Sequence, residues 1–172
     1  MRAPDLRSLR APEILALADE ALAGPDAELL SDCWNELRRR SRKRSLRALE
    51  RAARDRGVLP IPWLEQARAV VADFERETRG RHHLYFVLLG GYGREEREYG
   101  VYVGETYRRP ERRFEQHKAG IHDAGVVRRR GLQLLPSLAR SLNPLGRAEA
   151  RRLERAIAEA LRRAGIRVEG GH

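Results

Sequence analysis

The stretch His83-Leu84-Tyr85-Phe86-Val87-Leu88-Leu89 decides the fold of the second half of this chain. It is rich in residues that favour β-strands, and it is too short for a typical helix. Glycines at 90, 91 and 93 and a charged tip over 94–98 follow, and then a second run, Tyr99-Gly100-Val101-Tyr102-Val103-Gly104. Two such runs around a glycine-bearing loop predict a β-hairpin.

The residues after this hairpin predict helices and one more strand. Pro110 is a favourable first residue for a short helix that reaches about Ala119, and we expect a second short helix over 123–130. Residues 132–135 form a third candidate strand that Pro136 ends, and a final helix is expected over 147–164 before Gly165. The order predicts an α/β (α+β) domain over residues 82–172, with a small antiparallel three-stranded sheet flanked by helices.

Residues 1–80 have the apolar spacing of helices throughout, so we predict an all-helical N-terminal region. Three amphipathic helices are expected, and Gly57 and Gly80 would end the second and the third. Asp26 is a candidate cap for the second helix. Cys33 lies beside a tryptophan on an apolar stripe and is expected in the core.

The chain is strongly basic, with a formal net charge of +10 and a pI near 10.8. A basic surface attracts phosphate backbones, so we expect nucleic acid as the partner, although arginine-rich composition explains the charge equally well. Two clusters are candidate nucleic-acid contacts, with a solvated helix face as the competing interpretation. They comprise Arg38, Arg39, Arg40, Arg42, Lys43 and Arg44, and then Arg128, Arg129 and Arg130.

Other protein classes have little support in the sequence. No apolar run is long enough to span a membrane, no apolar secretion signal is evident, and a single cysteine excludes an internal disulfide. We therefore expect a cytoplasmic protein that does not contact membranes. The histidines at 82, 83 and 122 lack the spacing of a metal site and are expected to be surface residues.

Four kinds of side chain form a candidate site. Arg113 and His117 are four residues apart and share a helix face, and the preceding turn brings Tyr102 toward them. Glu154 lies at one shoulder of the apolar stripe of the final helix, and Glu149 lies at the other. Helical periodicity alone does not choose between the two carboxylates.

These residues, taken in order, resemble the signature of the GIY-YIG nucleases. The matching parts are Tyr85 in His83-Leu84-Tyr85, then Tyr102-Val103-Gly104, then Arg113-x-x-x-His117, and then Glu154. The resemblance covers roughly residues 82–170, about half of the chain.

The resemblance implies a metal-dependent endonuclease that hydrolyses phosphodiester bonds, in DNA more than in RNA. It implies that Glu154 holds one Mg²⁺ or Mn²⁺ ion and that Arg113 clamps the scissile phosphate. It further implies that Tyr85 or Tyr102 positions or deprotonates the attacking water, and that His117 assists proton transfer or contacts a phosphate. A non-catalytic nucleic-acid-binding module with a vestigial nuclease fold is the alternative.

Overall fold

The computed structural model describes residues 5–93, 98–121 and 124–171. It divides into two compact units, Met1–Leu64 and Glu65–His172. The division differs from the boundary near residue 81 that the sequence suggested, because the residues of the last N-terminal helix group with the second unit. Most of the expected charged hairpin tip, and the expected surface residue His122, fall outside the described residues.

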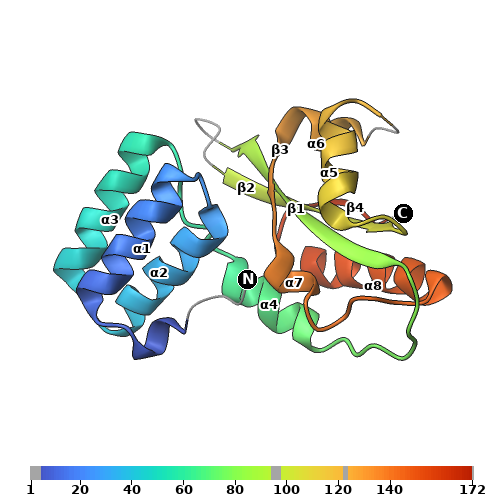
Figure 1. Ribbon diagram of the computed structural model, residues 1–172, viewed down its shortest axis with the longest axis horizontal. Helices are drawn as coiled ribbons and strands as arrows, with labels where there is room; N and C mark the ends of the chain where they lie inside the picture. The colour runs from blue at the N-terminus through green and yellow to red at the C-terminus, as the bar shows by residue number, and fades with distance from the viewer. Residues whose placement is uncertain (1–4, 94–97, 122–123, 172) are drawn as a thin grey trace. The chain divides into compact units, whose positions relative to one another are not determined.

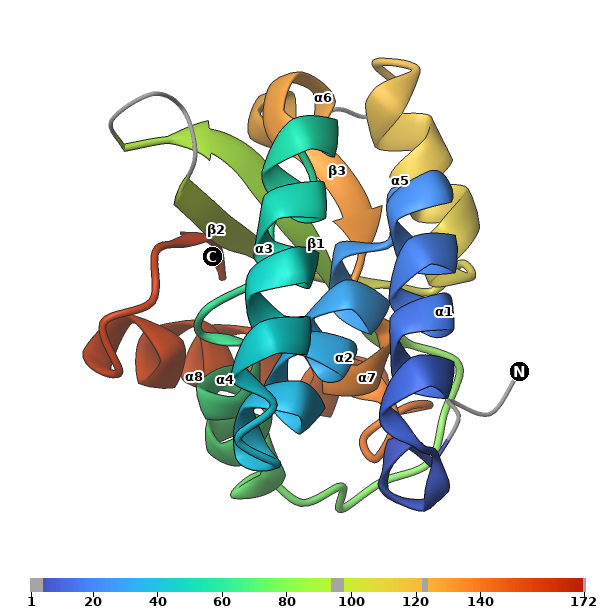
Figure 2. The ribbon, with the colours of Figure 1, turned by 90° about the vertical axis from the view of Figure 1, so that its left-hand side faces the viewer.

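The first unit is helical (Figures 1 and 2). Its elements are the 3₁₀ turn η1 (Leu6–Ser8) and the helices α1 (Ala11–Ala23), α2 (Ala27–Arg39) and α3 (Lys43–Arg56). Ile14, Leu30, Leu37 and Leu49 are fully or almost fully buried between these helices. Cys33 belongs to the same core, which confirms its expected position.

The sequence predicted one helix that ends at Gly57, but the structure has two helices here, α2 and α3, with a sharp turn between them. Ser41 has a positive φ of 54°, a conformation that interrupts a right-handed helix. At the other end of α2, the carboxylate of Asp26 accepts hydrogen bonds from the backbone N–H groups of Glu28 and Leu29, both at 3.1 Å. Asp26 is therefore the predicted helix cap, and Gly57, in the left-handed region, ends α3 as expected.

Arg40, a candidate nucleic-acid contact, is a structural residue of the first unit. Its guanidinium donates to the carbonyl oxygens of Leu9 at 2.6 Å and Leu6 at 2.8 Å, and its Nε donates to Glu36 at 2.6 Å. These contacts hold η1 against the end of α2 and leave only 20% of the Arg40 side chain exposed. A phosphate would have to displace this network to reach the guanidinium.

The second unit surrounds a mixed sheet with helices (Figure 1). Its elements are α4 (Leu64–Ala72), β1 (His83–Tyr92), β2 (Glu98–Thr106), α5 (Pro110–Lys118), α6 (Gly125–Arg130), β3 (Gly131–Leu134), α7 (Pro136–Ala139), α8 (Arg147–Arg163) and β4 (Val168–Gly170). The predicted hairpin is present, because β1 pairs antiparallel with β2. The third predicted strand, β3, pairs antiparallel with the other edge of β1.

The predicted three-stranded antiparallel sheet was wrong in number and in type. In the described residues the sheet has four strands, in the order β3-β1-β2-β4, and β4 runs parallel to β2. Val168–Gly170 is only three residues long and ends in glycine, so its composition gave no strand signal. It pairs because α8, which contacts both β2 and β4, returns the chain beside the free edge of β2.

Both faces of the central strand β1 are buried. Tyr85, Val87 and Leu89 alternate toward one face, where they pack with Val127 of α6 and Phe114 of α5. The alternating residues Leu84, Phe86 and Leu88 are also buried. Figure 1 shows α5 and α6 on one side of the sheet and α8 on the other, so helices cover both faces.

Helix α4 ends at Ala72, and the predicted continuation to Gly80 was wrong. Residues 73–80 contain no helix, because this segment is held by a carboxylate of α8. The side chain of Glu149, 6% exposed, accepts hydrogen bonds from the backbone N–H groups of Glu77 at 2.6 Å and Thr78 at 2.9 Å. The hydroxyl of Thr78 donates to the same carboxylate.

Replacing Glu149 with alanine should lower the free energy of unfolding by about 2–3 kcal/mol, because it leaves buried N–H donors without an acceptor. Burial raises the pKa of Glu149, but the hydrogen bonds from Thr78 and the backbone outweigh it and hold the pKa below its ordinary value. The contribution is therefore present above the unfolded pKa of about 4.3 and is lost as pH falls through the lower folded pKa. Urea unfolding at pH 7 and pH 3 measures both effects.

The matched control for this prediction is Glu159→Ala on the same helix. Glu159 is 56% exposed and pairs with Arg163 at 3.3 Å, so its loss should cost well under about 1 kcal/mol. Equal losses of stability in the two variants would contradict a structural role for Glu149.

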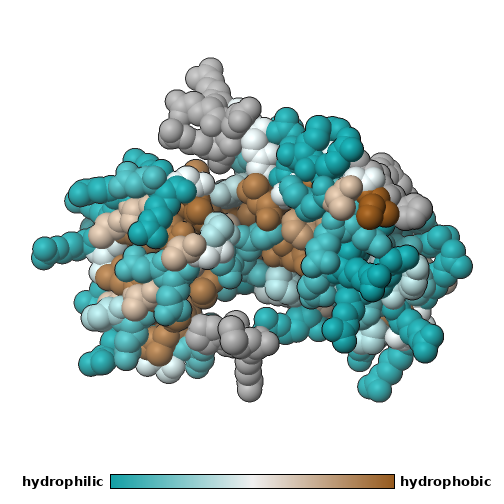
Figure 3. Space-filling view, turned by 45° about the horizontal axis from the view of Figure 1, so that its top comes forward, coloured by the Kyte–Doolittle hydropathy of each residue, from teal (hydrophilic) through white to brown (hydrophobic). Residues whose placement is uncertain are grey.

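Figure 3 shows mostly hydrophilic residues on the visible face of the second unit and a mixture of hydrophilic and hydrophobic residues on that of the first. Across the ranges that the structure describes, no helix combines the length and the apolar character that crossing a bilayer requires.

Candidate active site

The two tyrosines of the sequence signature lie side by side on neighbouring strands. Tyr85 of β1 pairs with Gly104 of β2, and Tyr102 lies two residues earlier on β2, on the same face. Their ring centroids are 5.9 Å apart. A Cβ atom at Gly104 would lie 2.6 Å from the Tyr85 ring and 2.7 Å from the Tyr102 ring, so glycine is what allows the two rings to meet there.

Gly104→Ala should push the two tyrosine rings apart and destabilise the second unit by about 1–3 kcal/mol, the usual cost of overpacking a core. Near-ultraviolet circular dichroism would report the changed tyrosine environment, and thermal unfolding would report the stability. Gly125→Ala is the matched control, because a Cβ there meets only the flexible end of Arg129. If Gly104→Ala behaves like this control, the close approach of the rings is not a constraint.

His117 is fully buried beneath the tyrosines. Its Nδ1 accepts a hydrogen bond from the backbone N–H of Ala124 at 3.0 Å. The neutral ring therefore carries its proton on Nε2, which lies 2.9 Å from the Tyr85 hydroxyl and donates to it. The imidazole is also 6.0 Å from the Tyr102 ring, measured between centroids. With no exposed surface, His117 is not positioned for a direct contact with a phosphate, and its Nε2 contacts Tyr85 instead.

Burial sets the acidity of both tyrosines. Desolvation raises the pKa of Tyr85 far above its ordinary value, and the guanidinium of Arg113 offsets only part of this effect. Desolvation also raises the pKa of Tyr102, while a hydrogen bond from Tyr85 and the charge of Arg113 act in the opposite direction. The neutral phenol is therefore the stable form of each tyrosine in the free protein, and Tyr85 donates its proton toward the oxygen of Tyr102.

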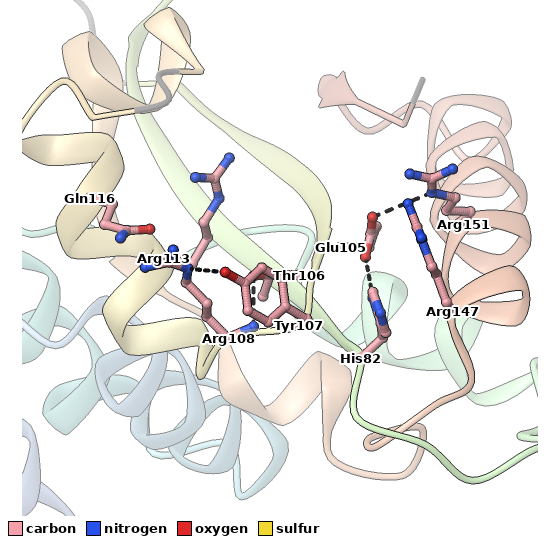
Figure 4. A pocket seen from close by; sticks show the side chains of 9 residues that line it. All are labelled: His82, Glu105, Thr106, Tyr107, Arg108, Arg113, Gln116, Arg147 and Arg151. Atoms are coloured by element: carbon pink, nitrogen blue, oxygen red, sulfur yellow. Dashed lines mark hydrogen bonds and ion pairs between the residues drawn. The ribbon is translucent and has the colours of Figure 1, made fainter.

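Arg113 extends from the first turn of α5 into an open pocket of about 630 Å³ (Figure 4). It is close enough to Tyr85 to donate a hydrogen bond to its hydroxyl, and its charge also acts on Tyr102. Arg113 therefore belongs both to the buried tyrosine and histidine cluster and to the open pocket.

Glu154, on α8, is near enough for its charge to act on Tyr102, but it is not among the residues that line the pocket of Arg113. Its charge raises the pKa of Tyr102, and it accepts a hydrogen bond from the backbone N–H of Gly171. Burial and then the charge of Glu105 raise the pKa of Glu154 to about 7, against smaller opposing effects of nearby arginines. An ionised carboxylate that is partly desolvated and repelled by a second carboxylate is stabilised by a bound cation.

The structure also distinguishes Glu149 from Glu154, which helical periodicity alone could not do. Glu149 is fully engaged with the segment at residues 77–78, whereas Glu154 is the carboxylate near Tyr102. Among the described residues no group of three or more His, Cys, Asp and Glu side chains is arranged to hold a metal ion. A hard cation at Glu154 would therefore take most of its oxygen ligands from water and substrate, as Mg²⁺ commonly does.

Some of the arginines that were predicted to contact nucleic acid make contacts within the protein instead. Arg130 donates to the carbonyl oxygens of Gly90 and Gly91, and its guanidinium lies 4.5 Å from the centroid of the Tyr92 ring. Arg39 forms an ion pair with Glu36 at 2.6 Å, although its side chain stays 60% exposed. The remaining members include the exposed residues Arg42, Lys43, Arg44 and Arg129.

Sequence reasoning missed two residues near the site. Asn143 makes a two-way hydrogen bond with the backbone of Leu84, at 2.8 and 2.7 Å, and so pairs with the edge of β1 beyond the end of β3. Glu105 lies on β2 three residues after Tyr102 and accepts a hydrogen bond from His82 Nδ1 at 2.8 Å. Strand alternation placed Glu105 on the face opposite Tyr102, so only the three-dimensional arrangement links it to Glu154.

Comparisons with protein-family models, with curated proteins and with solved structures found no match for this chain.

Proposed function

We propose that this protein is a metal-dependent endonuclease of the GIY-YIG type that hydrolyses phosphodiester bonds in nucleic acid, in DNA more than in RNA. The observation that carries the proposal is that Tyr85, Tyr102 and His117 lie together, and that the charges of Arg113 and Glu154 both act on Tyr102. These residues come from two strands and two helices, so the fold brings them near one another, not their nearness in sequence.

The chemistry of each group supports a role in phosphoryl hydrolysis. Arg113 presents a fixed positive charge with paired N–H donors, which match the charge that develops on the oxygens around phosphorus in the transition state. Tyr102 is less buried than Tyr85, which favours the hydroxyl of Tyr102 as the group that would hold the attacking water. Tyr85 and His117 would orient Tyr102 through their hydrogen bonds, as positioning residues.

The residues fit a divalent cation of the kind the resemblance implies. Glu154 would hold Mg²⁺ or Mn²⁺, because its carboxylate is an oxygen donor whose ionised form lacks full compensation by the protein. The ion would supply positive charge for the leaving oxygen and for the phosphate. The net charge of +10 would favour the approach of a polyanionic substrate.

Nicking of supercoiled plasmid DNA tests the proposal. Purified protein with Mg²⁺ or Mn²⁺ should convert supercoiled DNA to relaxed circles, and chelation of the metal should stop the conversion. Absence of cleavage of plasmid DNA and of structured RNA with either metal, combined with retained binding, would favour a non-catalytic nucleic-acid-binding module.

A further inference from the structure

Apart from Arg113, the residues that line the pocket lie outside the tyrosine and histidine cluster (Figure 4). One wall comes from the end of β2 and the segment that leads into α5, and the other comes from the start of α8. The lining residues are His82, Glu105, Thr106, Tyr107, Arg108, Arg113, Gln116, Arg147 and Arg151. A volume of about 630 Å³ is in the range of pockets that bind single small molecules.

The charge of this pocket selects an anionic ligand. Four of its lining residues are arginines and one is a glutamate. Glu105 pairs with His82 at 2.8 Å and with Arg151 at 3.6 Å, and the arginines that line the pocket outnumber this one carboxylate. Arginine is well suited to phosphate because its N–H groups form a planar fork.

An aromatic side chain lies at the edge of the same pocket. Tyr107 is 65% exposed, so much of its side chain is accessible to a ligand. Arg108 braces the ring: its Nε donates to the Tyr107 hydroxyl at 3.1 Å, and its guanidinium carbon lies 5.2 Å from the ring centroid. An exposed aromatic ring beside a cluster of arginines is the combination that holds a base and its phosphate together.

We propose that this pocket binds one unpaired nucleotide next to the scissile phosphate, with its base stacked on Tyr107 and its phosphate held by Arg147 and Arg151. The substrate would then be a nucleic acid with a single-stranded end or branch. In a continuous duplex each base is stacked on both faces, so Tyr107 has no free base to stack on. The inference rests on the proposed function for the position of the scissile phosphate, since Arg113 belongs to both sites.

Binding without cleavage tests this inference separately from the proposed function. The full chain, with EDTA present, is titrated against a fluorescent DNA duplex and against the same duplex with a single-stranded overhang, and anisotropy gives the two affinities. The overhang should bind about tenfold more tightly. Tyr107→Ala should remove this preference and leave duplex affinity unchanged, whereas Tyr107→Phe should retain it because the ring is kept.

Two controls separate stacking and phosphate binding from general effects. Leu132→Ala removes another exposed apolar side chain, 55% exposed and outside the pocket lining, and should keep the full preference. Arg147→Ala should weaken binding to the overhang more than Arg112→Ala does, although each variant loses one charge. Equal affinity for the two DNAs in the unmodified protein, or an unchanged preference in Tyr107→Ala, would overturn the inference.

Competition identifies the form of the ligand. A free deoxynucleoside monophosphate at millimolar concentration should not displace the overhang, because the strand adds contacts beyond the pocket. Displacement at micromolar concentration would overturn the inference in favour of a mononucleotide site. A preference for the overhang in a protein that cleaves nothing with Mg²⁺ or Mn²⁺ would support the pocket and contradict the proposed nuclease function.

Discussion

Arg113→Ala should lower the single-turnover rate of phosphodiester cleavage at least about a hundredfold while the protein stays folded and still binds DNA. The expected loss corresponds to about 3 kcal/mol of barrier, the usual effect of removing one charged donor that acts mainly in the transition state. Arg113 is suited to this role because it lies in the open pocket and yet reaches Tyr85 and Tyr102. Binding depends on many basic residues, so the loss of one arginine has a small effect on affinity.

Arg112→Ala is the matched control for this variant. Arg112 is the adjacent residue of α5, is exposed, and does not line the pocket, so its loss removes the same charge without changing the site. Arg113→Lys should recover only part of the rate, because lysine keeps the charge but lacks the planar fork of donors. If Arg112→Ala and Arg113→Ala slow cleavage equally, the effect comes from net charge and Arg113 has no specific role.

Local sequence patterns were sufficient to predict most of the helices and strands of the second unit. The β-rich runs and the glycines between them predicted β1 and β2, and Pro110 and Gly165 marked the limits of α5 and α8 within one or two residues. These signals are local, because strand composition, proline at a helix start and glycine after a helix end act within a few residues.

Features that depend on tertiary contacts were not predictable in the same way. The strand Val168–Gly170 exists because α8 brings it beside β2, and α4 ends early because Glu149 binds the backbone of residues 77–78. Arg40 looks like a surface cation in the sequence, but its carbonyl partners at Leu6 and Leu9 lie more than thirty residues away along the chain. Long-range partners of this kind leave no periodic signal.

In the candidate site, too, some features were predictable from the sequence and others depend on tertiary contacts. The order of Tyr85, Tyr102, Arg113, His117 and Glu154 is visible in the sequence, whereas their separate environments are not. His117 is completely buried, and this is tolerated because the N–H of Ala124 and the hydroxyl of Tyr85 form hydrogen bonds with its two ring nitrogens. Burial of this kind argues against a direct phosphate contact by His117, one of the two roles that the resemblance implies, and leaves proton transfer as a prediction.

Glu154→Gln should abolish metal-dependent cleavage, with a loss at least as large as that of Arg113→Ala, because an amide is a much weaker ligand for Mg²⁺ than a carboxylate. The same variant should make the metal-free protein more stable at pH 8. The folded pKa of Glu154 is raised to about 7, so its favourable contribution is complete below the unfolded pKa of about 4.3 and is lost as pH rises through 7. Glutamine at this position does not ionise, so the variant does not lose this stability at pH 8.

Thermal unfolding with and without Mn²⁺ at pH 5.5 and pH 8 distinguishes these effects from general damage. The unmodified protein should gain stability from Mn²⁺ at pH 8 and much less at pH 5.5, where a proton occupies Glu154 and competes with the ion. Glu154→Gln should show no gain at either pH, and Glu159→Gln, an exposed change on the same helix, should behave like the unmodified protein. A Glu154→Gln protein that still gains stability from Mn²⁺ at pH 8 would show that the ion binds at another residue, and the proposed role of this carboxylate would be wrong.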